Sequence, residues 1–182
     1  MSKIKRLIES YSKYIAIPWR NDAAHAQRVI FCVYNEQDEL KLRAKIDEFE
    51  IVTRQTGHEW HVFDLTDTFA EWLTAQRYAK SYFQQPQLIL TLYPKYLEFI
   101  AEEFVFFLNE NHVEPEAVVA LIGIGSLFGF LKVKDVVDKL APNVRGRLVV
   151  FFPGSYENNN YRLLDGYDGW NYLAVPITAD KE

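Results

Sequence analysis

The chain has 182 residues, of which 49% are hydrophobic and 15% aromatic, and its formal net charge is −5. This hydrophobic content excludes a disordered chain, and the length suits one domain with a core of its own. The negative charge excludes a globally basic surface that would bind nucleic acid or acidic membranes. We therefore expect a single domain over residues 1–182, with a surplus of apolar residues that suggests a partner surface.

Several features of the sequence favour a cytoplasmic protein. Cys32 is the only cysteine and lies in the apolar run RVIFCVY, so we expect a small buried side chain there. The N-terminus mixes charged with apolar residues and lacks the apolar core and cleavage site of a signal peptide. The longest apolar stretch, VVALIGIGSLFGFL, is short for a membrane span and contains three glycines. We expect no membrane segment.

The first part of the chain alternates helical and strand patterns. Apolar residues at spacings of three and four predict an amphipathic helix that begins at Ile4 and ends before Pro18. The continuous apolar run 29–33 predicts a strand covered on both faces, followed by a helix over 35–49. The segment HEWHVFDL, 58–65, predicts a second strand.

Helical patterns dominate the middle of the chain. Thr66 and Asp67 are expected to cap the helix that follows the second strand. From 75 to 112 the pattern stays helical, with interruptions at two prolines, and its last piece, helix 95–109, is apolar over more than one stripe. Because so apolar a helix is either deeply buried or shared with another chain, a homodimer through 95–109 is one alternative.

The last third of the chain continues the alternation. It predicts a strand over 117–124, a helix over 132–140 and a strand over 147–152. The tail, 161–177, has two strand-like pieces around two Asp-Gly turns, which predicts an edge hairpin or a last strand with an irregular loop. Strands that alternate with helices and are apolar throughout indicate a three-layer α/β fold, with helices on both faces of a mostly parallel sheet.

The segment GIGSLFG, 123–129, lies where a phosphate-binding loop belongs in such a fold, between a strand and a helix. Its spacing fits neither known template. A dinucleotide fingerprint needs glycine where Phe128 stands, and the Gly-Lys-Ser/Thr of a P-loop is missing. Glycines that permit a tight turn are the simpler interpretation. Anion binding by Gly123, Gly125 and Ser126 stays open, because helix starts bind anions without either motif.

A second glycine-containing segment, PGSYE, forms the predicted loop 153–157. Pro153 is expected to fix the exit of the strand before it, and Gly154 to let the chain turn. Together with loop 123–126, this loop would lie at the carboxyl ends of the strands, the usual ligand edge of an open α/β sheet.

The sequence shows no catalytic or metal-binding constellation. His58 and His61 would point to opposite faces of a strand, and neither a cysteine nor a third histidine lies nearby to complete a zinc site. Ser126 and Ser155 lack the G-x-S-x-G elbow of a nucleophile. Acidic pairs lie adjacent on helices rather than facing each other. We therefore expect no enzyme activity, no metal and no cofactor.

Basic residues within 132–147 precede an aromatic-rich segment, 156–172. Aromatics beside cations can bind a single nucleic-acid strand by stacking. The net acidity of the chain favours instead an aromatic surface that packs on the sheet edge or on a protein partner. Direct contact with nucleic acid is left open.

Two segments, LIGIGSLFGFLKVKDVVDKL and RLVVFFPGSYENNNYRLLDGYDGWNYLAVPI, resemble the BrxB family, a small subunit of the BREX phage-defence systems. The resemblance is carried by the glycine-x-glycine after a strand, by Phe130-Leu131 with the basic Lys132, by Pro153-Gly154-x-Tyr156, and by Asn171-Tyr172. The chain departs from the family pattern at Gly129, where a proline is frequent, and at Lys132, where an arginine is frequent.

The resemblance implies a P-loop-NTPase-like or Rossmann-like topology without a phosphate-binding motif. It also implies a non-catalytic component that acts with a phosphatase-like subunit, a large ATPase and a DNA methyltransferase. The leading hypothesis is an adaptor that binds the phosphatase-like subunit. The alternative is a degenerate nucleotide- or phosphate-binding protein that uses loops 123–126 and 153–157. The candidate partner or ligand edge consists of Gly123, Gly125, Ser126, Lys132, Pro153, Gly154, Ser155, Tyr156, Arg162, Asn171 and Tyr172.

Overall fold

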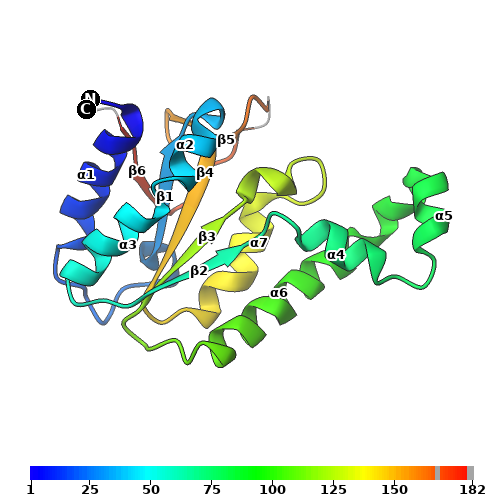
Figure 1. Ribbon diagram of the computed structural model, residues 1–182, viewed down its shortest axis with the longest axis horizontal. Coiled ribbons are helices and arrows are strands. Elements are labelled where there is room, and N and C mark those ends of the chain that lie inside the picture. The colour runs from blue at the N-terminus through cyan, green and yellow to red at the C-terminus, as the bar shows by residue number, and fades with distance from the viewer. Residues whose placement is uncertain (167–168, 180–182) are drawn as a thin grey trace.

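A mostly parallel sheet forms the centre of the structure, a computed structural model that describes residues 1–166 and 169–179 (Figure 1). Its strands within these residues are β1 (Val29–Tyr34), β2 (Trp60–Asp64), β3 (Val118–Ile122), β4 (Arg147–Glu157), β5 (Asn160–Leu163) and β6 (Val175–Ile177). The parallel strands are ordered β2-β3-β4-β1-β6, and β5 pairs antiparallel with the end of β4.

Helices cover both faces of this sheet, as predicted. They are α1 (Lys3–Ile15), α2 (Glu39–Arg43), α3 (Ile46–Gln55), α4 (Thr68–Thr74), α5 (Ala79–Gln84), α6 (Tyr93–Glu110) and α7 (Val133–Leu140). Short 3-10 helices join them: η1 (His25–Arg28), η2 (Glu36–Asp38), η3 (Pro86–Leu92), η4 (Ile124–Leu127) and η5 (Ala141–Asn143). The predicted helix 35–49 is in fact broken into η2, α2 and α3, because Lys45 leaves the helical conformation (φ −121°).

The alternation of side chains along β1 creates the two cores. Every residue of β1 is buried, as its apolar run predicted. Ile30, Cys32 and Tyr34 pack against α1, α2 and α3, whereas Val29 and Phe31 pack on the side of α4, α6 and α7. Because successive residues of a strand point to opposite faces, one short apolar run serves both layers. The result is the expected three-layer α/β architecture.

The strand order distinguishes the two expected topologies. In a Rossmann sheet the first strand lies beside the second, in the order 3-2-1-4-5-6. Here β1 lies between β4 and β6, and two strands separate it from β2. The order therefore differs from the Rossmann type. From β1 the chain leads to β2 on one side of the sheet order, and from β4 it leads to β6 on the other side. The connections therefore diverge between β1 and β4, and this switch point lies where Tyr34 is aligned with Pro153.

Helix α6 buries its main apolar stripe within the chain. Tyr96, Ile100 and Phe104 have no exposed surface, and the ring of Phe104 packs edge-on against Phe63 at 5.2 Å. Of the two explanations for this apolar helix, deep burial therefore accounts for the stripe. Phe106 lies on the opposite side and is 63% exposed.

The expected turn at Pro153-Gly154-Ser155 is wrong. Strand β4 runs on through these residues, and the chain turns at Asn158 and Asn159, which have φ of 51° and 62°. Two consecutive left-handed residues are typical of a two-residue hairpin turn, and asparagine tolerates that conformation. A Cβ on Gly154 would lie 2.0 Å from the carbonyl oxygen of Arg162 on β5. Glycine is thus required there for the close approach of two strands.

Two smaller expectations concern turns and caps. Thr66 and Asp67 do not cap α4, because the Thr66 hydroxyl donates to Asp64 and Asp67 makes no side-chain cap hydrogen bond. The first Asp-Gly turn of the tail is present, with the N–H of Gly166 donating to the carbonyl of Leu163. The second includes Asp168, which lies outside the described residues.

Candidate functional site

The two predicted loops meet at the carboxyl ends of β3 and β4. A Cβ on Gly125 would lie 3.6 Å from Cγ of Pro153 and 3.7 Å from Cδ2 of Leu164, which is ordinary contact. The structure therefore brings Gly125 beside Pro153 at the edge of the sheet where ligands bind in open α/β folds.

The chain itself fills the loop that a phosphate would need. Gly123 has φ of 75°, and a Cβ there would lie 2.5 to 2.7 Å from atoms of Thr66 and Asp64. The hydroxyl of Ser126 lies 2.7 Å from the carbonyl oxygen of Gly123 and 3.1 Å from that of Leu65, so its proton is given to backbone acceptors. Gly123 and Ser126 thus pack against the turn after β2, and this packing occupies the place where an anion would bind.

A polar network links the ends of β1 and β2 across this edge. The guanidinium of Arg43 donates to Glu39 at 2.7 Å, to Thr66 at 2.6 Å and to Asp64 at 3.3 Å. The hydroxyl of Tyr34 donates to the Glu39 carboxylate. Burial would raise the pKa of Asp64, but hydrogen bonds from Thr66 and the charge of Arg43 hold it below its ordinary value. The network satisfies its charges internally and fastens α2 to the sheet.

The switch point between β1 and β4 holds a cavity of about 170 Å³. Its walls include Gly154, Ser155 and Tyr156 from β4, with the carboxylates of Asp38 and Glu157. Small-molecule pockets usually measure about 300–1,000 Å³. The volume is too small for a nucleotide. Lys3 also lines the cavity and Asp38 is paired with Lys41 at 2.7 Å, so the charges of the lining do not select an anion or a cation.

A larger cavity, about 690 Å³, lies on the other side of the β4–β5 hairpin. It is formed largely by apolar side chains, among them Phe128, Leu131 and Trp170, with Lys132 at its wall. Asn171 and Tyr172 line a different hollow, where the Tyr172 hydroxyl donates to Asp138 at 2.9 Å.

The structure therefore does not gather the predicted residues into one site. Gly154, Ser155 and Tyr156 line the small cavity, and Lys132 lines the large one. Arg162 is exposed on β5, opposite Ser155. What these residues share is the carboxyl edge and the hairpin beside it, which form a surface and not an enclosed pocket.

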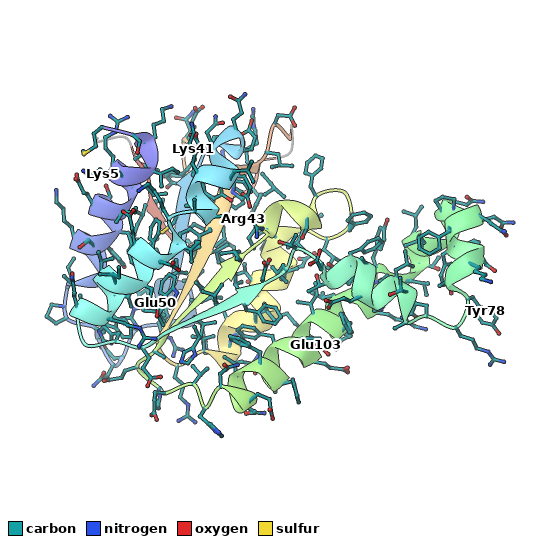
Figure 2. All side chains as sticks on the ribbon, in the orientation of Figure 1. Lys5, Lys41, Arg43, Glu50, Tyr78 and Glu103 are labelled. Atoms are coloured by element: carbon teal, nitrogen blue, oxygen red, sulfur yellow. The ribbon has the colours of Figure 1, made fainter. Side chains whose placement is uncertain are left out.

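Sequence reasoning missed the most prominent surface of the molecule. Residues 75–92, here called the arm, project away from the sheet, with Tyr78 at the far end (Figures 1 and 2). Four of its large apolar side chains, Tyr78, Phe83, Leu88 and Leu90, are 44 to 62% exposed, whereas Ile89 is buried. The arm contains Arg77 and Lys80, and the chain has no acidic residue from 72 to 97. This stretch of apolar residues without acidic ones is the sequence feature that could have indicated an exposed binding surface.

The histidines make ordinary contacts. His58 hydrogen-bonds the carbonyl of Glu116 at 2.9 Å, and His61 lies 3.1 Å from the carboxylate of Glu59. Within residues 1–166 and 169–179, no group of three or more His, Cys, Asp or Glu side chains is placed to hold a metal ion. No helix in the described part of the chain is both long and apolar enough to cross a membrane.

Fold and surface together define a class: an α/β protein with a mostly parallel sheet whose carboxyl edge is closed by its own side chains and whose apolar arm is open to solvent. The comparison with protein families makes this specific. The chain belongs to the BrxB family, because the family model described as BREX protein BrxB matches residues 62–176, more than half of the chain. The family predicted from local motifs is thus confirmed. No curated protein and no solved structure gave a significant match.

The matched region contains both predicted loops, the β4–β5 hairpin and the arm. Strand β1 and helices α1 to α3 precede it. Family membership connects the chain to the BREX phage-defence systems.

Proposed function

We propose that the protein is a non-catalytic adaptor subunit of a BREX-type phage-defence complex in the cytoplasm, and that its arm binds the phosphatase-like subunit of that complex. Membership of the BrxB family supports the system, and the exposed apolar arm supports the adaptor role. The large ATPase and the DNA methyltransferase complete the assembly.

The composition of the arm favours a protein partner with an acidic rim. Four large apolar side chains gathered on one projection are more than the scattered exposed residues of an ordinary monomer surface. Arg77 and Lys80 are basic in a chain of net charge −5, so the arm differs in sign from the protein that carries it. Aromatic and aliphatic anchors surrounded by such charges are typical of interface hot spots.

A matched pair of leucines tests this role. Leu90 lies on the arm and Leu40 on α2, and their side chains are both mostly exposed. We expect L90S combined with F83S to weaken co-purification of the phosphatase-like subunit, by about 2–4 kcal/mol or about 30- to 700-fold in affinity. L40S should leave it unchanged. All variants should keep their melting temperatures, because none of these side chains is buried.

Either of two experimental results would contradict the adaptor proposal. One is a tagged wild-type protein that, at native expression, captures no other subunit of the system while its deletion leaves phage restriction intact. The other, directed at the arm alone, is an F83S/L90S variant that captures the phosphatase-like subunit as well as wild type does.

A further inference from the structure

Arg147, a buried arginine, is the first residue of strand β4. Arg147 is only 7% exposed, and the hydrogen bond its side chain makes is from Nη1 to the carbonyl oxygen of Gly146 at 3.1 Å. No ion pair to Arg147 is found among residues 1–166 and 169–179. A guanidinium carries several N–H donors, and arginine is almost never fully buried unless it is paired. Its remaining guanidinium nitrogens donate to no acceptor in the described part of the chain and keep some access to solvent, so they are available to a ligand.

Aromatic stacking fixes the position of this guanidinium. Its central carbon lies 4.5 Å from the ring centre of Trp19. The ring of His58 stacks on Trp19 at 3.5 Å with an interplanar angle of 3°. Since the histidine ring covers one face of the indole, the guanidinium lies on the other. Trp19 is thus held between two side chains, and Arg147 is oriented without any anion.

The surroundings of Arg147 add positive charge. Arg28 donates to the carbonyl of Arg145 at 3.0 Å and to His25, and it makes no ion pair within the described residues. Burial lowers the pKa of Arg147; Tyr14 acts in the opposite direction, and the charge of Arg28 adds a smaller lowering. The nearby loop carboxylate of Asp22 is already paired with Arg20, at 3.2 Å. An anion at this place would therefore be favoured.

Arg147 lines a cavity of about 280 Å³ at the amino end of the sheet, away from the carboxyl edge and the arm. The other walls are largely apolar or aromatic, and include Tyr14, Ile17, Trp19 and Val175. Gln27 and Arg20 are polar side chains at its border. The volume suits a small ring or short aliphatic group that carries one acidic function.

We infer that this cavity binds a small anion, a carboxylate or phosphate carried on an apolar or aromatic group, with Arg147 holding the acidic function and Trp19 lining its body. A guanidinium matches both anions with two parallel hydrogen bonds. The site is independent of the proposed adaptor surface, because it lies at the opposite end of the strands.

Thermal unfolding with added anions tests the site. Benzoate and phenyl phosphate represent the two acidic functions, acetate and inorganic phosphate lack the ring, and sodium chloride keeps the ionic strength constant. We expect a saturable rise in Tm of about 3–6 °C at ten times Kd for benzoate or phenyl phosphate. The ring compounds should act at lower concentration than acetate or inorganic phosphate. Whichever of benzoate and phenyl phosphate raises the Tm at the lower concentration shows whether the site prefers a carboxylate or a phosphate.

Variants of Arg147 make the test specific. R147M should fold with a Tm near or above that of wild type without anion, because an apolar side chain replaces a buried charge that makes no ion pair among the described residues, and it should lose the anion response. R147K should keep the charge but weaken the response at least about tenfold, since the two-bond geometry is lost. R145Q, an exposed residue outside the cavity, should respond as wild type does. No saturable rise in wild type, or an unchanged rise in R147M or R147K, would overturn the inference.

Discussion

Replacing Gly154 by alanine tests the geometry of the β4–β5 hairpin. The added Cβ would lie 2.0 Å from the carbonyl oxygen of Arg162, whereas ordinary contact begins at 3.4 Å, a difference of 1.4 Å (3.4 − 2.0). The obstacle is backbone, which is paired with β4 and cannot rotate away as a side chain can. The two strands must therefore separate.

The expected cost follows from what that separation disrupts. Forcing an extra methyl into a packed site costs about 1–3 kcal/mol. The hydrogen bond from Leu164 N–H to the Pro153 carbonyl, 2.8 Å, lies beside the new methyl, and weakening it adds about 0.5–1.5 kcal/mol. We expect G154A to lose about 2–4 kcal/mol of unfolding free energy and about 5–15 °C in Tm.

Urea unfolding monitored by circular dichroism measures this loss. The control is G125A, whose Cβ meets Pro153 and Leu164 at 3.6 and 3.7 Å and should change the stability by less than about 0.5 kcal/mol. If G154A were no more destabilising than G125A, the close approach of β5 to Gly154 would be refuted. A positive φ is not the reason for glycine at 154, since Gly154 is absent from the residues with left-handed backbone.

Two further predictions concern α6 and the carboxyl edge. F104S should lose about 3–5 kcal/mol of unfolding free energy and fold poorly, because Phe104 is fully buried, whereas F106S should lose less than about 0.5 kcal/mol. Urea unfolding compares the two variants, and equal losses would contradict the placement of the helix. Asp64 has a lowered folded pKa, so its stabilising effect is present above its unfolded pKa and is lost as the pH falls through the folded value. D64N should therefore be less stable than wild type at pH 7, by no more than about 1 kcal/mol because the side chain is half exposed. The difference in stability should vanish at low pH. A difference that persists below the folded pKa of Asp64 would refute the role of the Asp64 charge.

The secondary structure and fold class were predictable wherever local pattern decides the outcome. The run at 29–33 is apolar at every position, which indicates a strand between two layers, and β1 is buried on both faces. The valines of 133–137 and Leu140 repeat at helical spacing, and α7 buries them. The BrxB resemblance was also local, since it depends on motifs within short segments.

The candidate site was predictable only in part. That loop 123–126 and residue 153 lie together at the carboxyl edge follows from parallel strands, whose ends share one edge. The space beside Gly123 is occupied by Thr66 and Asp64 from the turn after β2, which lie about sixty positions away in the sequence. No local pattern reports such a contact. The switch point itself required the strand order, which long-range pairing decides.

Local sequence by itself thus determined most of the strands and helices, the α/β class and the family of this protein, because apolar periodicity and motif spacing are properties of neighbouring residues. Tertiary structure alone decided that β4 continues through Pro153-Gly154-Ser155, because the partner strand β5 lies after the turn and supplies the hydrogen bonds. It also decided which apolar residues of α6 and the arm stay exposed, and that Arg147 is buried beside Trp19. Burial and pairing across distant segments depend on which elements meet in space.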